Sequence, residues 1–362
     1  MQGLKSITDA DVAGKRVLVH TDFDVPLKDG EVADDFRIRA ALPTLQFLKE
    51  KGAQKIIIIS KLGRPNGAVV EGLRMAPVQK RLAELIDISN IEVRENLRFD
   101  PREEANDESF AKELAALGDI FVNEAFADSH RAHASIVGVP KFLPSYAGLR
   151  FMEEVTRITE ALTPPKQSLA IIGGAKFETK QPLLEKLATL YGTIFLGGAL
   201  ANDLLKSRGM PVGASLISDA PVPTSLAENF HIQEPIDLVV SGAAASRPAK
   251  TGDVRQDEKI VDIGANTSAA WAVQIQAAGF VLWNGPVGIY EHGFVSGTDV
   301  LAEALVHSSC KALIGGGDTA AAIQKFTFDE ARVFISTGGG AMLQLLADGT
   351  LPGIEALKTS AV

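Results

Sequence analysis

The chain has 362 residues, of which 46% are hydrophobic and 22% are charged, a balance typical of folded globular proteins. Its formal net charge of −9 disfavours nucleic acid as a partner, and its single cysteine, Cys310, excludes an internal disulfide and a multi-cysteine zinc site. No stretch reaches about 18 consecutive apolar residues, and the opening "MQGLKSITDADVAGKR" lacks the apolar core of a signal peptide, so we expect a cytoplasmic protein without a membrane partner.

Apolar strands and helical patterns alternate along the first half of the chain. In chain order, the sequence predicts a strand at 16–23, a helix at 34–52, a strand at 55–60, a helix at 77–86, a strand at 91–97, a helix at 109–118 and a strand at 119–126. All-apolar strands that alternate with helices indicate a parallel sheet covered on both faces.

The second half repeats this alternation, with glycines at the ends of its strands. Its predicted strands with their glycine loops are 168–176, 193–199, 280–288, 312–318 and 332–341. A bare backbone at such a loop lets amide hydrogens and a helix N-terminus approach an anion closely. One Gly-Gly pair also serves tight packing, but five such ends in one half favour phosphate binding.

Asp318 follows three glycines in "ALIGGGDTAAAIQKF" (312–326) and points to a metal. A carboxylate beside a phosphate would repel it unless Mg²⁺ intervened, and Mg²⁺ is commonly held by one or two carboxylates together with phosphates. The sequence contains neither G-x-x-x-x-G-K-[ST] nor G-x-G-x-x-G after the first strand, so the expected Mg-nucleotide site differs from a P-loop and from a Rossmann NAD site.

Several motifs, taken in order, resemble the phosphoglycerate kinase family over nearly the full chain. They are "DFDVP" (22–26), "LGRPNG" (62–67), "ENLRF" (95–99), "HRAHAS" (130–135), "GGAK" (173–176), "WNGPVGIYE" (283–291), "GGGDT" (315–319) and "STGGGA" (336–341). The resemblance implies two doubly wound, Rossmann-like parallel-sheet domains. We expect an acid-substrate domain at 1–148, a hinge helix at 149–165, a nucleotide domain at 166–345 and a tail at 346–362 that packs back on the first domain.

The same resemblance implies a function. The family transfers a phosphoryl group reversibly between ATP and the carboxylate of 3-phosphoglycerate, giving ADP and 1,3-bisphosphoglycerate, with Mg²⁺ and domain closure, in glycolysis and gluconeogenesis. The attacking carboxylate is already ionised at neutral pH, so the reaction needs positioning and charge neutralisation rather than a general base. The expected partners are these small molecules, and the expected state is a monomer.

Family positions carry over to this chain residue by residue. The implied catalytic residues are Arg37, Lys176, Gly316 and Gly339. The implied acid-substrate residues are Asp22, Asp24, Arg37, Lys61, Arg64, Arg98 and Arg131. The implied nucleotide residues are Gly173, Gly174, Lys176, Lys180, Gly197, Gly198, Asn284, Pro286, Glu291, Gly317, Asp318 and Thr319, with Asp318 also holding the metal. Asp22 is expected to accept a hydrogen bond from the substrate hydroxyl, and Thr319 to donate one to a phosphate.

The acid site departs from the family pattern at three positions. His20 stands where the family has arginine, Asp24 where it has asparagine, and Lys61 where it has histidine. We hypothesise that Lys61 pairs with Asp24 and offsets its charge. Two alternatives stay open: the same fold acting on another phosphorylated acid, and a nucleotide-binding regulator without turnover.

Overall fold

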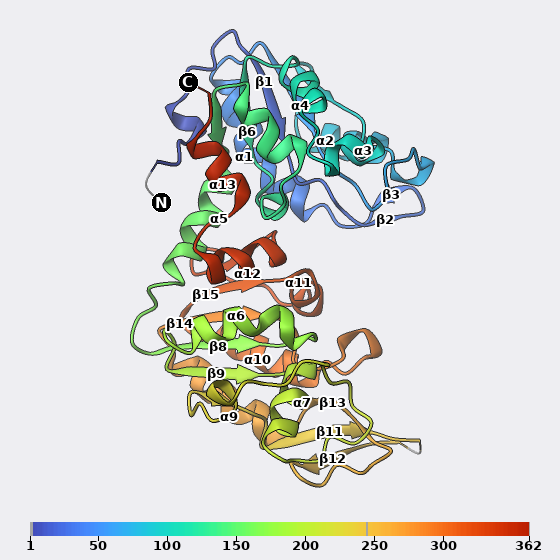
Figure 1. The fold of residues 1–362 in the computed structure, drawn as a ribbon, viewed down its shortest axis with the longest axis vertical. Coiled ribbons are helices and arrows are strands. Elements are labelled where there is room, and N and C mark those ends of the chain that lie inside the picture. The colour runs from blue at the N-terminus through green and yellow to red at the C-terminus, as the bar shows by residue number, and fades with distance from the viewer. Residues whose placement is uncertain (1–2, 244, 362) are drawn as a thin grey trace. The chain divides into compact units, whose positions relative to one another are not determined.

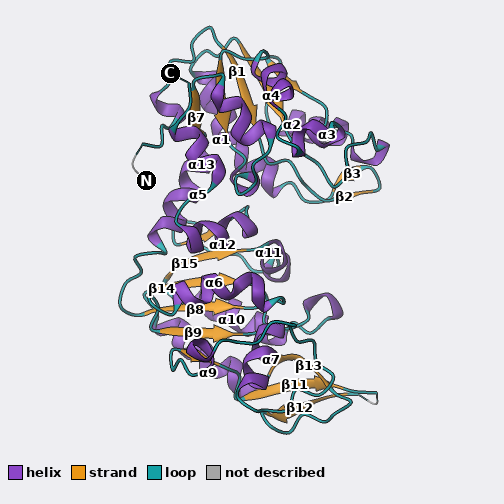
Figure 2. Ribbon diagram, in the orientation of Figure 1, coloured by secondary structure: helices purple, strands orange, loops and turns teal. Residues whose placement is uncertain are grey.

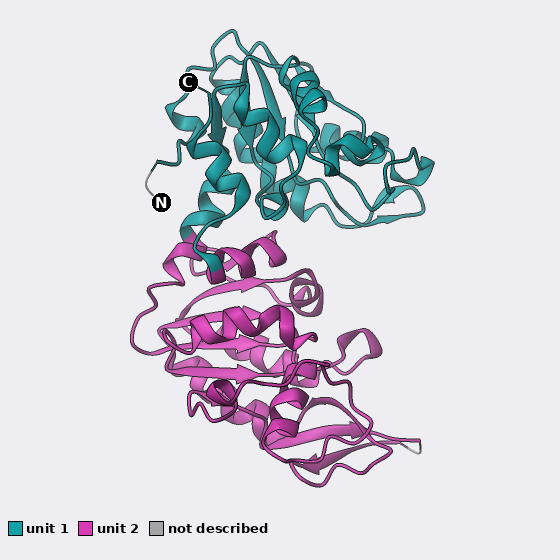
Figure 3. Ribbon diagram, in the orientation of Figure 1, with its two compact units in different colours: residues 1–156, 348–362 teal, residues 157–347 magenta. Residues whose placement is uncertain are grey.

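The computed structural model describes residues 3–243 and 245–361, and the chain divides into two compact units (Figure 3). Unit 1 comprises residues 1–156 and 348–362, and unit 2 comprises residues 157–347. The boundary falls within the helix α5 (Leu149–Glu160), and the C-terminal tail belongs to unit 1. That α5 acts as a hinge stays a prediction.

Unit 1 is built around a parallel sheet of five strands in the order β5-β4-β1-β6-β7 (Figure 1). Its strands are β1 Arg16–His20, β2 Leu27–Lys28, β3 Glu31–Val32, β4 Lys55–Ile59, β5 Ile91–Val93, β6 Ile120–Asn123 and β7 Ser145–Ala147. Its helices are α1 Phe36–Glu50, α2 Ala76–Leu85, α3 Pro101–Glu104, α4 Glu108–Ala115, α5, and α13 Pro352–Lys358. Because β1 lies at the centre of the sheet, its apolar residues are buried on both faces.

Unit 2 contains a parallel sheet of six strands in the order β10-β9-β8-β14-β15-β16 (Figure 2). The strands of the unit are β8 Ser168–Ile172, β9 Thr193–Leu196, β10 Ile232–Gln233, β11 Asp237–Ser241, β12 Ser246–Lys250, β13 Lys259–Ile263, β14 Phe280–Asn284, β15 Lys311–Gly315 and β16 Val333–Ile335. Its helices are α6 Phe177–Leu187, α7 Gly198–Ser207, α8 Thr224–Ala227, α9 Ala265–Ala277, α10 Ser296–His307, α11 Gly317–Ile323 and α12 Gly339–Asp348. The core includes Trp271 of α9, which stacks on Phe195 of β9 with ring centroids 4.3 Å apart.

The predicted fold class is confirmed, and every strand predicted above is present, shortened where its loop begins. The antiparallel sheet β12-β11-β13 was not predicted. Its middle strand alternates buried and half-buried residues, whereas β12 is mostly exposed and contains Pro248, so the sequence of β12 carries little strand signal. This small sheet positions β13 beside the candidate nucleotide site.

Glu124 anchors the N-terminus of α5 inside unit 1. Its carboxylate accepts hydrogen bonds from the hydroxyl of Thr44 at 2.6 Å and from the backbone N–H groups of Arg150 at 3.1 Å and Phe151 at 3.3 Å. A Cβ at Gly148 would lie 1.8 Å from this carboxylate, so only glycine fits there. Burial raises the pKa of Glu124 from 4.5 to about 7, although the hydrogen bonds oppose this shift.

This raised pKa predicts a pH dependence of stability. Between pH 4.5 and pH 7 the unfolded chain loses the Glu124 proton while the folded chain keeps it, so the free energy of unfolding falls as pH rises through this window. Glu124→Gln removes the contribution of this proton to the pH dependence. The difference in the free energy of unfolding between the variant and the unaltered protein should therefore change by up to about 3 kcal/mol between pH 4.5 and pH 7. Urea unfolding of both proteins at pH 5 and pH 8 measures it; parallel pH profiles would contradict the prediction.

Candidate active site

Six of the seven predicted acid-site residues of unit 1 follow the carboxyl ends of parallel strands. Asp22 and Asp24 follow β1, Lys61 and Arg64 follow β4, Arg98 follows β5 and Arg131 follows β6, while Arg37 lies in the first turn of α1. Since these strand ends lie on one edge of the sheet, side chains far apart in the sequence are brought together.

Arg37 and Asp22 form one side of this cluster. The guanidinium of Arg37 donates to Asp22 Oδ1 at 2.9 Å and to the carbonyl oxygen of Asp24 at 3.1 Å. Asp22 Oδ2 is buried and has no hydrogen-bond partner among the residues that the structure describes. Burial raises the pKa of Asp22 to about 7, with the nearby Arg37 acting in the opposite direction. A substrate hydroxyl would satisfy the unpaired oxygen.

Asp24 lies between two arginines rather than beside Lys61. Its carboxylate accepts from Arg64 at 3.0 Å, from Arg98 at 3.1 Å and from the backbone N–H of Gly63 at 2.8 Å. The hypothesis of a direct Lys61–Asp24 pair is therefore wrong. The carboxylate occupies donors that an anionic substrate would use.

Lys61 is instead buried with two other carboxylates. Its side chain is 1% exposed, and its ammonium lies 3.1 Å from Glu103 and 3.4 Å from Asp128. Asp128 also contacts Arg131 at 3.4 Å and Arg98 at 3.7 Å, and this positive surrounding holds the pKa of Asp128 well below its usual range despite burial. Sequence reasoning missed Glu103 and Asp128, because neither stands in a motif that indicates its partner.

Three histidines border this cluster, and their pKa values indicate neutral rings. Burial and the nearby Lys61 lower the pKa of His20 well below its usual value and that of His133 to about 3. Burial and Arg131 also lower the pKa of His130. His20, which stands where the family carries arginine, is thus a neutral side chain. Lys61, which stands where the family carries histidine, places a basic side chain in the same cluster.

These contacts predict the effect of Asp24→Asn. Removing the carboxylate releases Arg64 and Arg98 from an internal anion, so the KM for 3-phosphoglycerate should fall, on the order of tenfold for one removed repulsive charge at the site. Steady-state kinetics with varied acid measures this change. Asp29→Asn is the matched control, because Asp29 is exposed in the turn between β2 and β3 and has a positive φ of 53° that asparagine tolerates. A raised KM would contradict the prediction.

The predicted nucleotide residues of unit 2 also follow the carboxyl ends of strands. They lie at or after the ends of β8, β9, β14 and β15 in turn, and Gly339, predicted as catalytic, follows β16. Two glycine loops meet closely, because a Cβ added to Gly339 would lie 2.5 Å from the Cα of Gly316, whose φ is 101°. Gly317 has open space around it. Within the triple glycine, Gly316 thus allows close packing against Gly339, and Gly317 leaves the backbone accessible.

Lys180 is held at the centre of these loops. Its ammonium donates to the carbonyl of Gly173 at 2.7 Å and to Asn284 Oδ1 at 2.9 Å, and Asn284 Nδ2 donates to the carbonyl of Gly315 at 2.9 Å. Burial lowers the pKa of Lys180 to about 8, with Asp318 opposing the shift. Lys176 is exposed in the left-handed region, with a φ of 65°, at the N-cap of α6. The two lysines therefore do not form a pair on one helix surface.

Asp318 is accessible for a metal. Its carboxylate is exposed, and Oδ1 accepts a hydrogen bond of 3.3 Å from the hydroxyl of Tyr290, a residue that the sequence reasoning did not select although it adjoins Glu291 in a motif. Within residues 3–243 and 245–361, no three metal-ligating side chains gather at one place. An ion at Asp318 would hence take its other ligands from phosphate oxygens and water, as Mg²⁺ commonly does.

Thr319 does not fit its predicted role. It is fully buried; its hydroxyl donates to the carbonyl of Gly315 at 2.9 Å and accepts from the backbone N–H of Gly285 at 2.7 Å. The hydroxyl thus joins the loops after β14 and β15 and has no hydrogen left for a phosphate. Sequence alone could not reveal this, because Gly285 lies on a different strand.

Thr319→Val should therefore act on stability. Valine leaves the N–H of Gly285 without a partner, and the free energy of unfolding should fall by about 1–3 kcal/mol. Thermal unfolding of Thr319→Val beside Thr319→Ser, which keeps the hydroxyl, measures the effect. Loss of ADP affinity in Thr319→Val at unchanged stability would favour the phosphate role after all.

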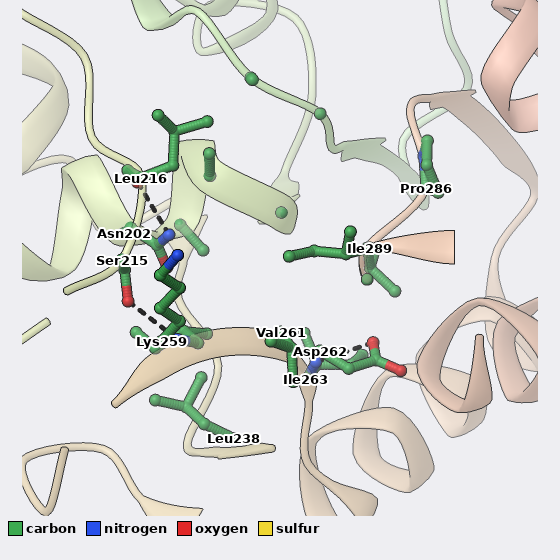
Figure 4. Close-up of a pocket in the computed structure, with 18 of the residues that line it drawn as sticks. Asn202, Ser215, Leu216, Leu238, Lys259, Val261, Asp262, Ile263, Pro286 and Ile289 are labelled. Carbon is green, nitrogen blue, oxygen red and sulfur yellow. Dashed lines mark hydrogen bonds between the residues drawn. The ribbon is translucent and has the colours of Figure 1, made fainter. Parts of the chain in front are cut away.

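A cavity of about 660 Å³ lies beside these loops, entirely within unit 2 (Figure 4). Of the predicted residues, it is lined by Gly174, Gly198, Pro286, Glu291 and Asp318. Gly173 and Gly197 do not line it. They pack tightly instead, because an added Cβ would lie 2.1 Å from the carbonyl oxygen of Pro286 and 2.5 Å from the side chain of Val287, respectively.

Comparison with known proteins identifies the family. The sequence profile described as "Phosphoglycerate kinase" matches residues 7–94 and 88–349. The chain belongs to the phosphoglycerate kinase family. Phosphoglycerate kinase from Roseiflexus sp. (strain RS-1) is 40% identical over 98% of this chain and 99% of its own length, and that from Thermomicrobium roseum is 40% identical over 99% and 100%. The structure of phosphoglycerate kinase from Coxiella burnetii matches with a TM-score of 0.84 and 34% identity over 98% of each chain.

The family membership agrees with the position of the acid-site residues and of the glycine loops, which lie at the carboxyl edges of the two parallel sheets. Among the described residues, no helix combines the length and apolar character that crossing a bilayer requires.

Proposed function

We propose that this chain transfers the γ-phosphoryl group of ATP reversibly to the carboxylate of 3-phosphoglycerate, giving ADP and 1,3-bisphosphoglycerate, in glycolysis and gluconeogenesis. The observation that carries the proposal is that one chain of this family holds two clusters of different chemistry, one in each unit. Unit 1 gathers arginines suited to a phosphorylated acid, and unit 2 gathers glycine loops, Lys180 and Asp318, suited to a metal-bound nucleotide.

In unit 1, the acid would bind to Arg37, Arg64, Arg98 and Arg131, with its hydroxyl on Asp22. Guanidinium groups suit carboxylate and phosphate because they donate two parallel hydrogen bonds. Arg37 is the residue that would stabilise the phosphoryl group during transfer. Lys61 lies deeper and would act by positioning Asp128, and through it Arg98 and Arg131.

In unit 2, Lys180 and Lys176 would bind the nucleotide phosphates, and Asp318 would hold Mg²⁺. The metal, when bound, neutralises phosphate charge in the transition state. A bound phosphate would stabilise the ammonium form of Lys180, whose pKa burial lowers to about 8. Gly316 and Gly339 would let backbone amides meet the transferring group. Meeting of the two substrates by domain closure is part of this proposal, as are a monomeric state and a cytoplasmic location.

Steady-state kinetics test the proposal against both alternatives. ADP formation is measured with Mg-ATP in the presence and absence of 3-phosphoglycerate, and again with excess EDTA. The proposal expects turnover only with both the acid and the metal. Turnover with another phosphorylated acid alone would favour a changed substrate, and tight Mg-ADP binding without turnover on any acid would favour the regulator.

A further inference from the structure

The far end of the unit 2 cavity carries a cation that the proposed function does not use. Lys259 is the first residue of β13 and lines the cavity with Asn202, Ser215, Leu216 and Leu238 (Figure 4). Pro286 and Ile289 lie on the opposite side of the view. Pro286 follows the loop of Asn284, which contacts Lys180, so the phosphate groups of a nucleotide belong on that side. Its base would then reach toward Lys259.

Lys259 supplies a charged donor at this end, where the neighbouring polar side chains are neutral. The hydroxyl of Ser215 accepts from the backbone N–H of Ile260 at 2.8 Å, and Asn202 Nδ2 donates to the carbonyl of Leu216 at 3.0 Å. Lys259 is exposed, and its ammonium makes no hydrogen bond or ion pair with any residue described in the structure. Glu258, its neighbour in sequence, is already paired with Arg247 at 2.7 Å.

The surrounding side chains suit a flat base with a polar edge. Leu216, Leu238 and Val261 line this end of the cavity (Figure 4) and would offer apolar contacts for the faces of the base, while Lys259 would meet its rim. An ammonium donates hydrogen bonds and accepts none. Guanine presents two neighbouring acceptors, O6 and N7, whereas adenine presents an N6 amino donor beside N7. A bare ammonium therefore interacts better with a 6-oxopurine than with adenine.

Resting on the proposed nucleotide function, we propose that Lys259 is a specificity-determining residue that favours 6-oxopurine nucleotides, those of guanine and hypoxanthine. Asn202 leaves its Oδ1 without a partner among the described residues, but its amide group is turned to Leu216. Because Oδ1 is buried, it is not accessible for the paired contact, through oxygen and amide together, by which asparagine commonly recognises adenine. Of the residues named at this end of the cavity, Lys259 is the one that offers a charged donor to the edge of the base.

Calorimetric binding of Mg-ADP, Mg-GDP and Mg-IDP to the full chain tests this proposal. Lys259→Met should weaken GDP and IDP about tenfold relative to ADP, since a good bidentate contact to a base edge discriminates by about 5- to 150-fold. IDP isolates the O6 contact because hypoxanthine lacks the 2-amino group. Lys250→Met is the matched control, an exposed lysine of β12 that does not line the cavity, and should leave all three affinities unchanged.

Two results would overturn the proposal. Equal weakening of all three nucleotides in Lys259→Met would place the lysine on ribose or phosphate, and unchanged affinities would place it outside the site. Both leave acid-dependent turnover of ATP intact in the unaltered chain, so they fault only the base assignment. Failure of the unaltered chain to bind any of the nucleotides would fault the proposed function itself, and this inference with it.

Discussion

Arg37→Ala is expected to lower kcat for phosphoryl transfer by about 10³-fold, in the range found when a charged or hydrogen-bonding group that stabilises a transition state is removed. Arg37 lies in the first turn of α1 at the carboxyl edge of the unit 1 sheet and is held by Asp22 and by the carbonyl of Asp24. These contacts orient its guanidinium before substrate binds, so little reorganisation is needed when charge develops on the transferring group.

The chain offers a close control for this variant. Arg39 lies two residues further along the same helix, its side chain is 53% exposed, and it pairs with Asp35 one turn earlier. Arg39→Ala should change kcat less than twofold, because surface pairs contribute little. Rapid-mixing measurement of a single turnover separates the transfer step from product release. Equal effects of the two variants would contradict a catalytic role for Arg37.

Lys61→Met is expected to destabilise unit 1 by about 3–5 kcal/mol, the cost of leaving buried partners of an ion pair uncompensated. Lys61 is 1% exposed, and its partners Glu103 and Asp128 are also buried. Without the ammonium, both carboxylates would remain in a region that excludes water. Asp128 would then be paired only with Arg98 and Arg131 of the three cations, and the side chains of the acid site would shift from their present positions.

Urea unfolding measures this effect. Lys80→Met serves as the matched control, since Lys80 is 61% exposed, pairs with an exposed Glu31, and should change the free energy of unfolding by no more than about 1 kcal/mol. A Lys61→Met protein as stable as the control would show that the buried cluster is held by other forces.

The sequence predicted where the sites lie better than it predicted what each side chain contacts. Gly316 and Asp318 could be placed at the end of a strand, because apolar runs ending in glycine indicate the carboxyl edge of a parallel sheet. Thr319 could not be separated from a phosphate ligand, because its partner Gly285 belongs to another strand. Local patterns carry no information about such pairings.

The partners of Lys61 show the same limit. The substitution could be recognised as a departure from the family, and Asp24, the carboxylate introduced by another departure, was the partner hypothesised for it. The structure instead pairs Lys61 with Glu103 of α3 and with Asp128 beyond β6, elements whose positions depend on the whole sheet. Lys259 could not be found at all, because β13 belongs to the sheet that the sequence did not predict.

Trapping the acyl phosphate product tests whether the phosphoryl group is transferred to a carboxylate. The protein is incubated with Mg-ATP and 3-phosphoglycerate in the presence of hydroxylamine, which converts an acyl phosphate to a hydroxamate. We expect hydroxamate and ADP in equal amounts, both abolished when Mg²⁺ or the acid is omitted and both strongly reduced in Arg37→Ala. ADP formed without hydroxamate would mean hydrolysis rather than transfer to a carboxylate, and would contradict the proposed reaction.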